Sequence, residues 1–182
     1  SIERIFKNDA EPRDIAAIIV EPVQGEGGFN VAPKDFMARL RALCDEHGIL
    51  LIADEVQTGF GRTGKMFAIE YSGVVPDLMT IAKGLTSGYV PMGGLIVSDK
   101  VFEVIEAHGD FNHGFTYSGH PVAAAVGLEN LRILKEEKIL EKVREETAPY
   151  LQKRLRELED HPLVGEVRGV GMLGAIELAK NK

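Results

Sequence analysis

Residues 48–54 read GILLIAD, a run of five apolar residues between a glycine and a carboxylate. An apolar run without polar alternation is typical of a strand that is buried on both faces of a parallel sheet. Asp54 closes this run, and ligands of open α/β sheets bind beyond the carboxyl ends of the strands. The stretch therefore predicts an α/β fold with Asp54 beside a ligand site. The alternative is that Asp54 serves as a turn or capping aspartate.

A second strand signal lies downstream, where residues 77–84 read DLMTIAKG and the glycine-rich TSGYVPMGG follows at 86–94. Lys83 ends this apolar run, whereas most other lysines stand among charged or polar residues. Desolvation disfavours an ammonium, so an amine beside apolar groups is shifted toward its neutral, nucleophilic form. Lys83 is therefore a candidate nucleophile. The alternative is a strand-end lysine with its stem buried and its ammonium in water.

Asp54 and Lys83 together fit a cofactor with two chemical handles. The lysine would form a Schiff base with an aldehyde, and the carboxylate would hold a protonated ring nitrogen, as pyridoxal phosphate requires. Strand alternation puts Val56 on the same face as Asp54, where it would lie against the ring. Gln57 offers an amide to the phenolic oxygen of the cofactor. Glu55 faces the opposite way and is expected to be structural.

The remaining elements alternate between strands and helices, as an α/β fold requires. Strands are expected at 15–21, 78–82 and 94–98, and helices at 33–47, 101–107, 121–136 and 139–158. Pro149 should kink the last of these helices. After a boundary at 161–162, residues 164–178 indicate a glycine-interrupted β segment.

Several other features are expected to be structural. Residues 59–64, GFGRTG, lack the lysine and the spacing of a P-loop, so we expect a tight loop with Arg62 in an ion pair. Cys44 falls on an apolar helical face, which predicts a buried thiol rather than a nucleophile. That face is formed with Phe36, Met37, Leu40 and Leu43. The five histidines show no ligand spacing, so no metal is expected.

Composition favours a soluble, cytoplasmic enzyme. The hydrophobic fraction of 45% suffices for a core, and no apolar run approaches membrane-spanning length. The chain opens without a signal-peptide pattern, and its single cysteine fits a reducing compartment. A net charge of −7 argues against nucleic acid as a partner. Neither nucleic acid nor a membrane is therefore expected to bind.

Four ordered motifs carry a resemblance to a known family. They are EPVQGEGG at 21–28, ADEVQTGFGRTG at 53–64, AKG at 82–84 and HGFTYSGHP at 113–121. In order and spacing they resemble the motifs of class III (ω-amino) aminotransferases, and the similarity runs through essentially the whole chain. The resemblance implies a pyridoxal 5'-phosphate enzyme of fold type I.

The resemblance also assigns roles to individual residues. It implies Lys83 as the Schiff-base lysine, Asp54 as the pyridinium partner, Val56 against the ring and Gln57 near the phenolic oxygen. A homodimer with shared active sites is implied, in which Thr116 binds the cofactor phosphate of the neighbouring subunit. Glu26 matches the position of a glutamate that pairs with the arginine for the substrate α-carboxylate.

Two parts of the chain resemble different branches of this family. From Ser1 to about Asp77 the sequence resembles bacterial 4-aminobutyrate aminotransferases. From about Ala82 onward it resembles pyruvate-using aminotransferases of diamines and other ω-amino compounds. A diverged member and a recombined sequence are both open as explanations.

Family members are much longer than 182 residues, so the chain is expected to be an internal segment. Residues 1–160 would form the second half of the cofactor-binding large domain, a mostly parallel sheet with helices on both faces. Residues 161–182 would begin a small α+β C-terminal domain. The resemblance places the loop that grips the phosphate, and the arginine for the α-carboxylate, outside this chain.

The implied reaction is transfer of an amino group from an ω-amino acid or a diamine to a 2-oxo acid, such as 2-oxoglutarate or pyruvate. Two rival hypotheses are another pyridoxal-phosphate chemistry on the same scaffold, an aminomutase or a decarboxylase, and a catalytically incompetent fragment. The intact Lys83, Asp54 and Gln57 favour an enzyme. The missing parts predict that the 182-residue chain alone does not turn over.

Overall fold

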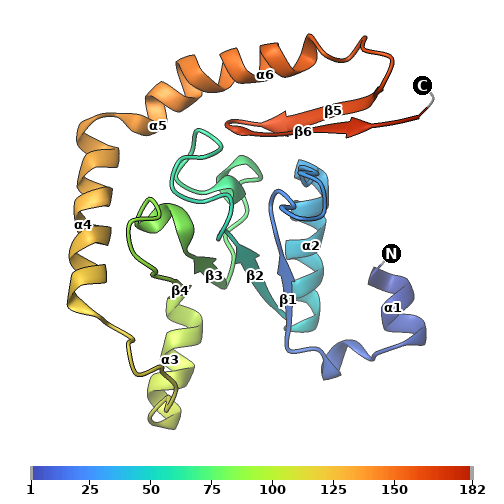
Figure 1. The fold of residues 1–182 in the computed structure, drawn as a ribbon. Coiled ribbons are helices and arrows are strands. Elements are labelled where there is room, and N and C mark those ends of the chain that lie inside the picture. Colours follow the sequence, from blue (N-terminus) through green and yellow to red (C-terminus); the bar gives the residue numbers. More distant parts are fainter. Residues whose placement is uncertain (1, 181–182) are drawn as a thin grey trace.

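The computed structural model describes residues 2–180. At its centre lies a four-stranded sheet with the strand order β1-β2-β3-β4 (Figure 1). The strands are β1 Ala17–Val20, β2 Leu50–Asp54, β3 Leu78–Ile81 and β4 Gly94–Val97. The first three are parallel, and β4 is antiparallel to β3. The expected α/β class with a mostly parallel sheet is confirmed.

Helices and short turns connect and flank these strands. The α-helices are α1 Ile2–Asn8, α2 Lys34–His47, α3 Asp99–His108, α4 Pro121–Glu136, α5 Ile139–Lys142 and α6 Ala148–Arg156. The 3₁₀ turns are η1 Pro12–Asp14, η2 Ala68–Tyr71 and η3 Lys83–Leu85, and η4 Val143–Thr147 is a π-helical turn. Helix α1 was not predicted, although Ile2, Ile5 and Phe6 have helical spacing.

The core of the large sheet forms between β2 and α2. Leu51 on β2 is fully buried and packs in one cluster with Cys44 and Leu40 of α2. Gly48 ends the helix in the left-handed conformation with φ 68°, where glycine has no steric penalty. The expected burial of Cys44 is confirmed, but Phe36 is 43% exposed, so its place on the apolar face was wrong. It lies about 100° around the helix from Met37, the buried residue next to it.

Asp77, directly before β3, forms hydrogen bonds to α2 and to β2. Its Oδ2 accepts hydrogen bonds from Arg41 Nη1 on α2 and from the backbone N–H of Leu51, both at 2.8 Å. Burial alone would raise the pKa of Asp77. The bonds from Leu51 and Arg41, with the charges of Arg41 and Lys100, outweigh burial and hold that pKa below its ordinary value. The carboxylate therefore stays charged and links strand to helix.

The long helix expected over 139–158 is divided by its proline. Pro149 has no N–H to donate to the preceding turn, and the π-helical η4 lies directly before it, between α5 and α6. In Figure 1, α4, α5 and α6 form an arm that leads from the sheet to a separate β-hairpin.

The hairpin consists of β5 Val164–Val170 and β6 Leu173–Leu178, which pair antiparallel. Its tip contacts the glycine-punctuated loop after β2, because Met172 N donates to Arg62 O at 2.7 Å. Gln152 of α6 donates to the carbonyls of Gly171 and Leu173, each at 2.9 Å. The expected boundary between domains near residue 160 stays a prediction, and residues 181–182 of the second segment lie outside the described residues.

Gly171→Ala is expected to release the hairpin tip from this loop. A Cβ at Gly171 would lie 2.3 Å from Thr63 Cα and 2.5 Å from Arg62 O, both backbone atoms that cannot rotate away. The residue also has φ 62°, which disfavours alanine. Overpacking and backbone strain together predict a loss of about 2–4 kcal/mol in the free energy of unfolding. Urea denaturation of the full-length protein, with amide hydrogen exchange across β5 and β6, measures the effect.

Gly73→Ala is the matched control for this substitution. Gly73 has a similar φ of 71°, but a Cβ there meets no atom within 4 Å. The substitution is therefore expected to lower the free energy of unfolding by about 1 kcal/mol, from backbone strain alone. Equal losses in the two variants would contradict the close packing of the hairpin tip against the loop.

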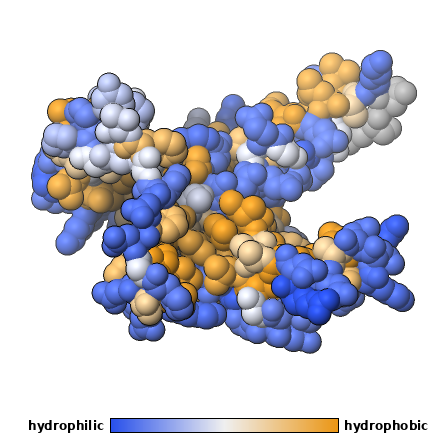
Figure 2. Space-filling model, turned by 90° about the horizontal axis from the view of Figure 1, so that it is seen from below, coloured by the Kyte–Doolittle hydropathy of each residue, from blue (hydrophilic) through white to orange (hydrophobic). Residues whose placement is uncertain are grey.

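A large apolar area is left on the molecular surface. Figure 2 shows apolar residues gathered in the middle of one face between hydrophilic margins. Exposed aromatic side chains include Tyr89 at 83% and Tyr117 at 82%. Within residues 2–180, no helix is long and apolar enough to cross a membrane.

Candidate functional site

The predicted site residues come from the carboxyl ends of neighbouring parallel strands. Asp54 is the last residue of β2, and Lys83 follows β3 by two positions. Because β2 and β3 are paired in parallel, their ends lie at one edge of the sheet. Glu21 directly follows β1 at the same edge. Strand order therefore brings together residues that lie up to 62 positions apart (83 − 21).

A cavity of about 420 Å³ opens at this edge. It is lined by Glu21, Gly25, Glu26, Gly28, Phe29, Asp54, Val56, Gln57 and Lys83. Five of the six residues predicted for the site, all except Thr116, are in this lining. The lining combines an amine, three carboxylates, an amide and apolar groups, which suits a polar ring system better than a purely apolar ligand.

Lys83 contacts Gln57 in the lining of the cavity. Its Nζ donates to Gln57 Oε1 at 2.5 Å, so the amine and the amide are held side by side. The expectation that Lys83 is desolvated is wrong in this structure: the residue is exposed, because its side chain leaves the sheet edge into an open cavity. Its backbone is unusual, with φ 42° in the left-handed region.

Asp54 is half-buried and oriented by two donors. Both Val56 N at 3.1 Å and Thr80 Oγ1 at 3.0 Å donate to its Oδ1. Within residues 2–180 no hydrogen bond ends on its Oδ2. One oxygen is thus used for orientation and the other is left for a ligand, such as the N–H of a protonated ring.

The loop that follows β1 forms the opposite wall of the cavity. Gly25 N donates to Glu21 Oε2 at 2.7 Å, which folds the loop back on the strand end and explains Glu21 as a structural residue. Arg168, on the distant hairpin, donates through Nε to Gly28 O at 2.7 Å. Arg168 was not among the predicted site residues, and its neighbours on β5 are the small or apolar Val167 and Gly169. This loop carries the exposed Glu26 into the lining of the cavity.

Glu55, the residue that follows β2, is structural, as expected from its facing away from Asp54. It is fully buried and accepts hydrogen bonds from Thr58 Oγ1 and from the backbone N–H groups of Ala68 and Ile69. Burial raises the pKa of Glu55, although these three hydrogen bonds oppose the shift. The residue therefore anchors η2 beneath the site instead of entering it.

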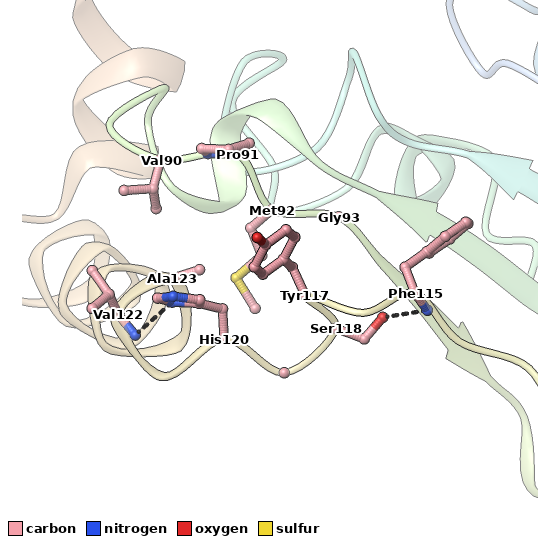
Figure 3. A pocket seen from close by; sticks show the side chains of 11 residues that line it. Val90, Pro91, Met92, Gly93, Phe115, Tyr117, Ser118, His120, Val122 and Ala123 are labelled. Atoms are coloured by element: carbon pink, nitrogen blue, oxygen red, sulfur yellow. Dashed lines mark hydrogen bonds between the residues drawn. The ribbon is translucent and has the colours of Figure 1, made fainter.

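Thr116 lies outside the Lys83 cavity and is exposed. Its segment borders a second cavity of about 640 Å³ (Figure 3). In Figure 3, Met92 and Tyr117 both line this cavity, and His120 accepts a hydrogen bond from Val122 N at the start of α4. Thr116 is therefore not brought to the Lys83 of its own chain.

The expectation for the charge of Arg62 is wrong. Arg62 does not form the expected ion pair with any residue in 2–180, and its Nε is buried without a hydrogen-bond partner. Its backbone carbonyl, rather than its charge, fixes the loop by accepting from Met172. Among the described residues, no group of three or more His, Cys, Asp or Glu is arranged to hold a metal ion.

Comparison with protein families identifies the fold around this site. The family model described as "Aminotransferase class-III" matches residues 1–182. The chain belongs to the class III aminotransferases. Both branches that the sequence resembles are among its relatives.

Two curated relatives of this class III chain illustrate the two branches. Putrescine–pyruvate aminotransferase of Pseudomonas aeruginosa is 63% identical over 169 residues, covering 93% of this chain and 37% of the relative. The 4-aminobutyrate aminotransferase GabT of Escherichia coli K12 is 51% identical over 178 residues, covering 98% and 41%. The chain thus spans about two fifths of the length of these relatives.

Solved structures of transaminases have the same fold. A transaminase from the marine bacterium Virgibacillus superposes with a TM-score of 0.93 at 50% identity, covering 100% of this chain and 41% of that one. The ω-transaminase from Pseudomonas jessenii in complex with PMP has a TM-score of 0.90 at 43% identity, covering 98% and 40%. The fold-type I assignment of this class III segment is therefore confirmed.

The residues present fit pyridoxal phosphate, the cofactor of this family. An amine, Lys83, is available for the aldehyde, and the second oxygen of Asp54 is available for the ring N–H. Gln57 uses its carbonyl oxygen toward Lys83, which leaves its NH₂ group for an acceptor such as a phenolic oxygen. Val56 supplies an apolar surface in the same lining.

Proposed function

We propose that the complete protein transfers an amino group from an ω-amino acid or a diamine to a 2-oxo acid, with pyridoxal phosphate as cofactor. The observation that carries this proposal is the convergence of Lys83, Gln57 and Asp54 in one cavity at the carboxyl edge of parallel strands. An amine, an amide and an oriented carboxylate in this arrangement are what the chemistry requires.

Each side chain has a role in this proposal. When bound, pyridoxal phosphate supplies an aldehyde for amines and a ring that withdraws electrons from the donor carbon. Lys83 holds the cofactor covalently and, once free, moves the proton at the donor carbon as general base and acid. Asp54 keeps the ring nitrogen protonated, since an opposite charge within hydrogen-bond reach favours the charged form. Gln57 orients Lys83, and Val56 packs on the ring.

Glu26 is proposed to act in substrate selection. It is exposed on the loop that walls the cavity, so its carboxylate is free to pair with an arginine or to meet a positively charged amine. The 63% identity to a putrescine–pyruvate aminotransferase supports a diamine as donor and pyruvate as acceptor. The 51% identity to a 4-aminobutyrate aminotransferase supports an ω-amino acid as the second donor class.

A homodimer with shared sites is part of the proposal. The segment that carries Thr116 is rich in exposed aromatic side chains: Phe111 at 70%, Phe115 at 78% and Tyr117 at 82%. Exposed apolar groups of this density mark interaction surfaces. Burial of this surface by a second copy would carry Thr116 to the partner's cofactor phosphate. The cytoplasm is proposed as the compartment, on the composition of the chain.

An amino-group balance on the full-length protein tests the function. The purified protein with pyridoxal phosphate receives putrescine or 4-aminobutyrate as donor and pyruvate or 2-oxoglutarate as acceptor. Formation of alanine or glutamate in proportion to the donor consumed supports transamination. Release of carbon dioxide would instead identify a decarboxylase. Rearrangement of the donor without a new amino acid would identify an aminomutase. The 182-residue chain alone is expected to give no measurable turnover.

Thr116→Ala is expected to weaken cofactor retention in the full-length protein. A hydroxyl hydrogen bond to a charged phosphate is worth about 1.5–3 kcal/mol, which corresponds to a loss of roughly tenfold to a hundredfold in affinity. A heterodimer of a Lys83→Ala subunit with a Thr116→Ala subunit shows where the bond is made. If Thr116 reaches across the interface, one site is wholly wild-type and retains one cofactor per dimer.

The opposite arrangement gives a different count. If Thr116 serves its own subunit, each site of the heterodimer carries one lesion, and cofactor retention stays poor at both. The Lys83→Ala homodimer and the Thr116→Ala homodimer are the reference samples, measured by gel filtration followed by determination of bound pyridoxal phosphate.

A further inference from the structure

A side chain on α4 holds the backbone that directly follows Lys83. Asn130 donates through Nδ2 to Gly84 O at 2.8 Å and to Leu85 O at 3.1 Å. Its Oδ1 accepts a hydrogen bond from Ser87 Oγ at 2.6 Å. The side-chain amide of Asn130 therefore donates to the carbonyls of two successive residues and accepts from a third residue close by, Ser87.

This turn has a conformation that its own sequence does not favour. Lys83 has φ 42° and Ser87 has φ 50°, so two non-glycine residues within five positions lie in the left-handed region. Such residues persist only where the surrounding structure holds them, and they cluster at functional sites. Two backbone bonds inside the turn are long: Thr86 N to Lys83 O and Ser87 N to Gly84 O are both 3.3 Å, whereas Leu85 N to Ala82 O is 3.0 Å. Contacts from outside therefore add to the hydrogen bonds that the turn makes itself.

Packing fixes where the turn lies but not how its backbone is rotated. Leu85 is buried in a cluster with Phe60 and Leu134, which joins the turn to α4. A Cβ at Gly84 would lie 2.9 Å from Phe60 Cβ, so the chain passes close to that ring. Apolar contacts are not directional. The hydrogen bonds from Asn130 are directional and orient the two carbonyls next to Lys83.

We infer that Asn130 is a positioning residue for Lys83: its amide locks the left-handed turn and so directs the lysine amine toward Gln57 and the cavity. The inference rests on the proposed function, in which Lys83 carries the cofactor. Asn130 does not itself line the Lys83 cavity, and it acts through the backbone of Gly84 and Leu85. Without these bonds the turn relaxes, and the amine samples positions away from the cofactor aldehyde.

The test uses the full-length protein with Asn130→Leu, which keeps the approximate size and removes every polar contact. Apoenzyme is mixed with pyridoxal phosphate, and the rate at which the covalent link appears in the absorption spectrum is recorded. This rate is expected to fall about tenfold, because misplacement of a reacting group by about 1 Å costs up to a hundredfold. The kcat for transamination should fall similarly, while KM for the amine donor changes less than threefold, since Glu26, the residue proposed for substrate selection, lies on the loop after β1 and Asn130 bonds to Gly84 and Leu85.

Two further variants keep the test decisive. Asn130→Ser, too short to reach either carbonyl, repeats the measurement if the leucine variant does not fold. Glu129→Gln, on the same helix, removes only an exposed ion pair with Arg132 and is expected to leave the attachment rate unchanged. Thermal unfolding of each apoenzyme separates positioning from stability.

The outcomes are distinct. A lower unfolding temperature with an unchanged attachment rate in both Asn130 variants overturns the inference and makes Asn130 a purely structural link. Borohydride reduction and peptide mapping of the wild-type protein test separately whether Lys83 carries the cofactor, as the proposed function requires. Label on another lysine overturns the role of Lys83, and the inference with it. Label on Lys83 with no effect of Asn130 removes the inference alone.

Discussion

Lys83→Ala in the full-length protein is expected to abolish both the yellow covalent cofactor complex and transamination. In residues 2–180, Lys83 is the lysine that lines the cavity with Asp54 and Gln57. Because no other lysine of residues 2–180 lines this cavity, we expect no other amine to replace it as the attachment point or as the base at the donor carbon. A loss of general acid–base catalysis alone costs about 10²–10⁴-fold, and loss of the covalent link adds to it. Borohydride reduction of the wild-type protein followed by peptide mapping measures the attachment site directly.

The control for this variant is Lys65→Ala. Lys65 lies over the ring of Tyr71 at 4.8 Å and donates to Glu70 O, so it is a structural lysine away from the cavity lining. Its replacement is expected to leave the spectrum and turnover intact. Substantial turnover by Lys83→Ala, or label on a different lysine, would contradict the assignment.

Asp54→Asn is expected to leave covalent cofactor attachment possible and to slow proton transfer at the donor carbon by about 10²–10³-fold. Removal of one preorganised electrostatic group costs this much in other enzymes. An asparagine Oδ1 can still accept from Val56 N and Thr80 Oγ1, so the strand end keeps its geometry. What is lost is the negative charge that keeps the ring nitrogen protonated. Single-turnover kinetics with the amine donor measure the step.

Thr80→Val is the companion variant for Asp54. It removes one of the two hydrogen bonds that orient the carboxylate and leaves its charge in place. We expect a loss of tenfold or less in the same single-turnover rate, because Val56 N still holds Oδ1. If Asp54→Asn barely changes that rate, Asp54 is not the partner of the ring nitrogen.

Local sequence rules were sufficient for most elements and for the chemistry of the site. The uninterrupted apolar run before Asp54, the proline before α2 and Gly48 after it are local signals, and each was predictive of the structure. Errors arose where a side chain's environment depends on distant segments. The prediction that Lys83 is buried was wrong because its surroundings are set by the open sheet edge. The prediction of an ion pair for Arg62 was wrong because the loop that carries it is held against the hairpin tip by a backbone hydrogen bond.

The sequence by itself determined the alternation of strands and helices and the residue types of the site, because apolar periodicity and glycine and proline positions act over a few residues. Only the tertiary structure decided which groups meet. Parallel pairing of β2 with β3 brings Asp54 and Lys83 to one cavity, 29 positions apart in the chain (83 − 54). Packing of α4 on the turn after Lys83 brings in Asn130, and the hairpin brings Arg168 to Gly28, 140 positions away. Such contacts follow from the closure of long loops, which no local pattern encodes.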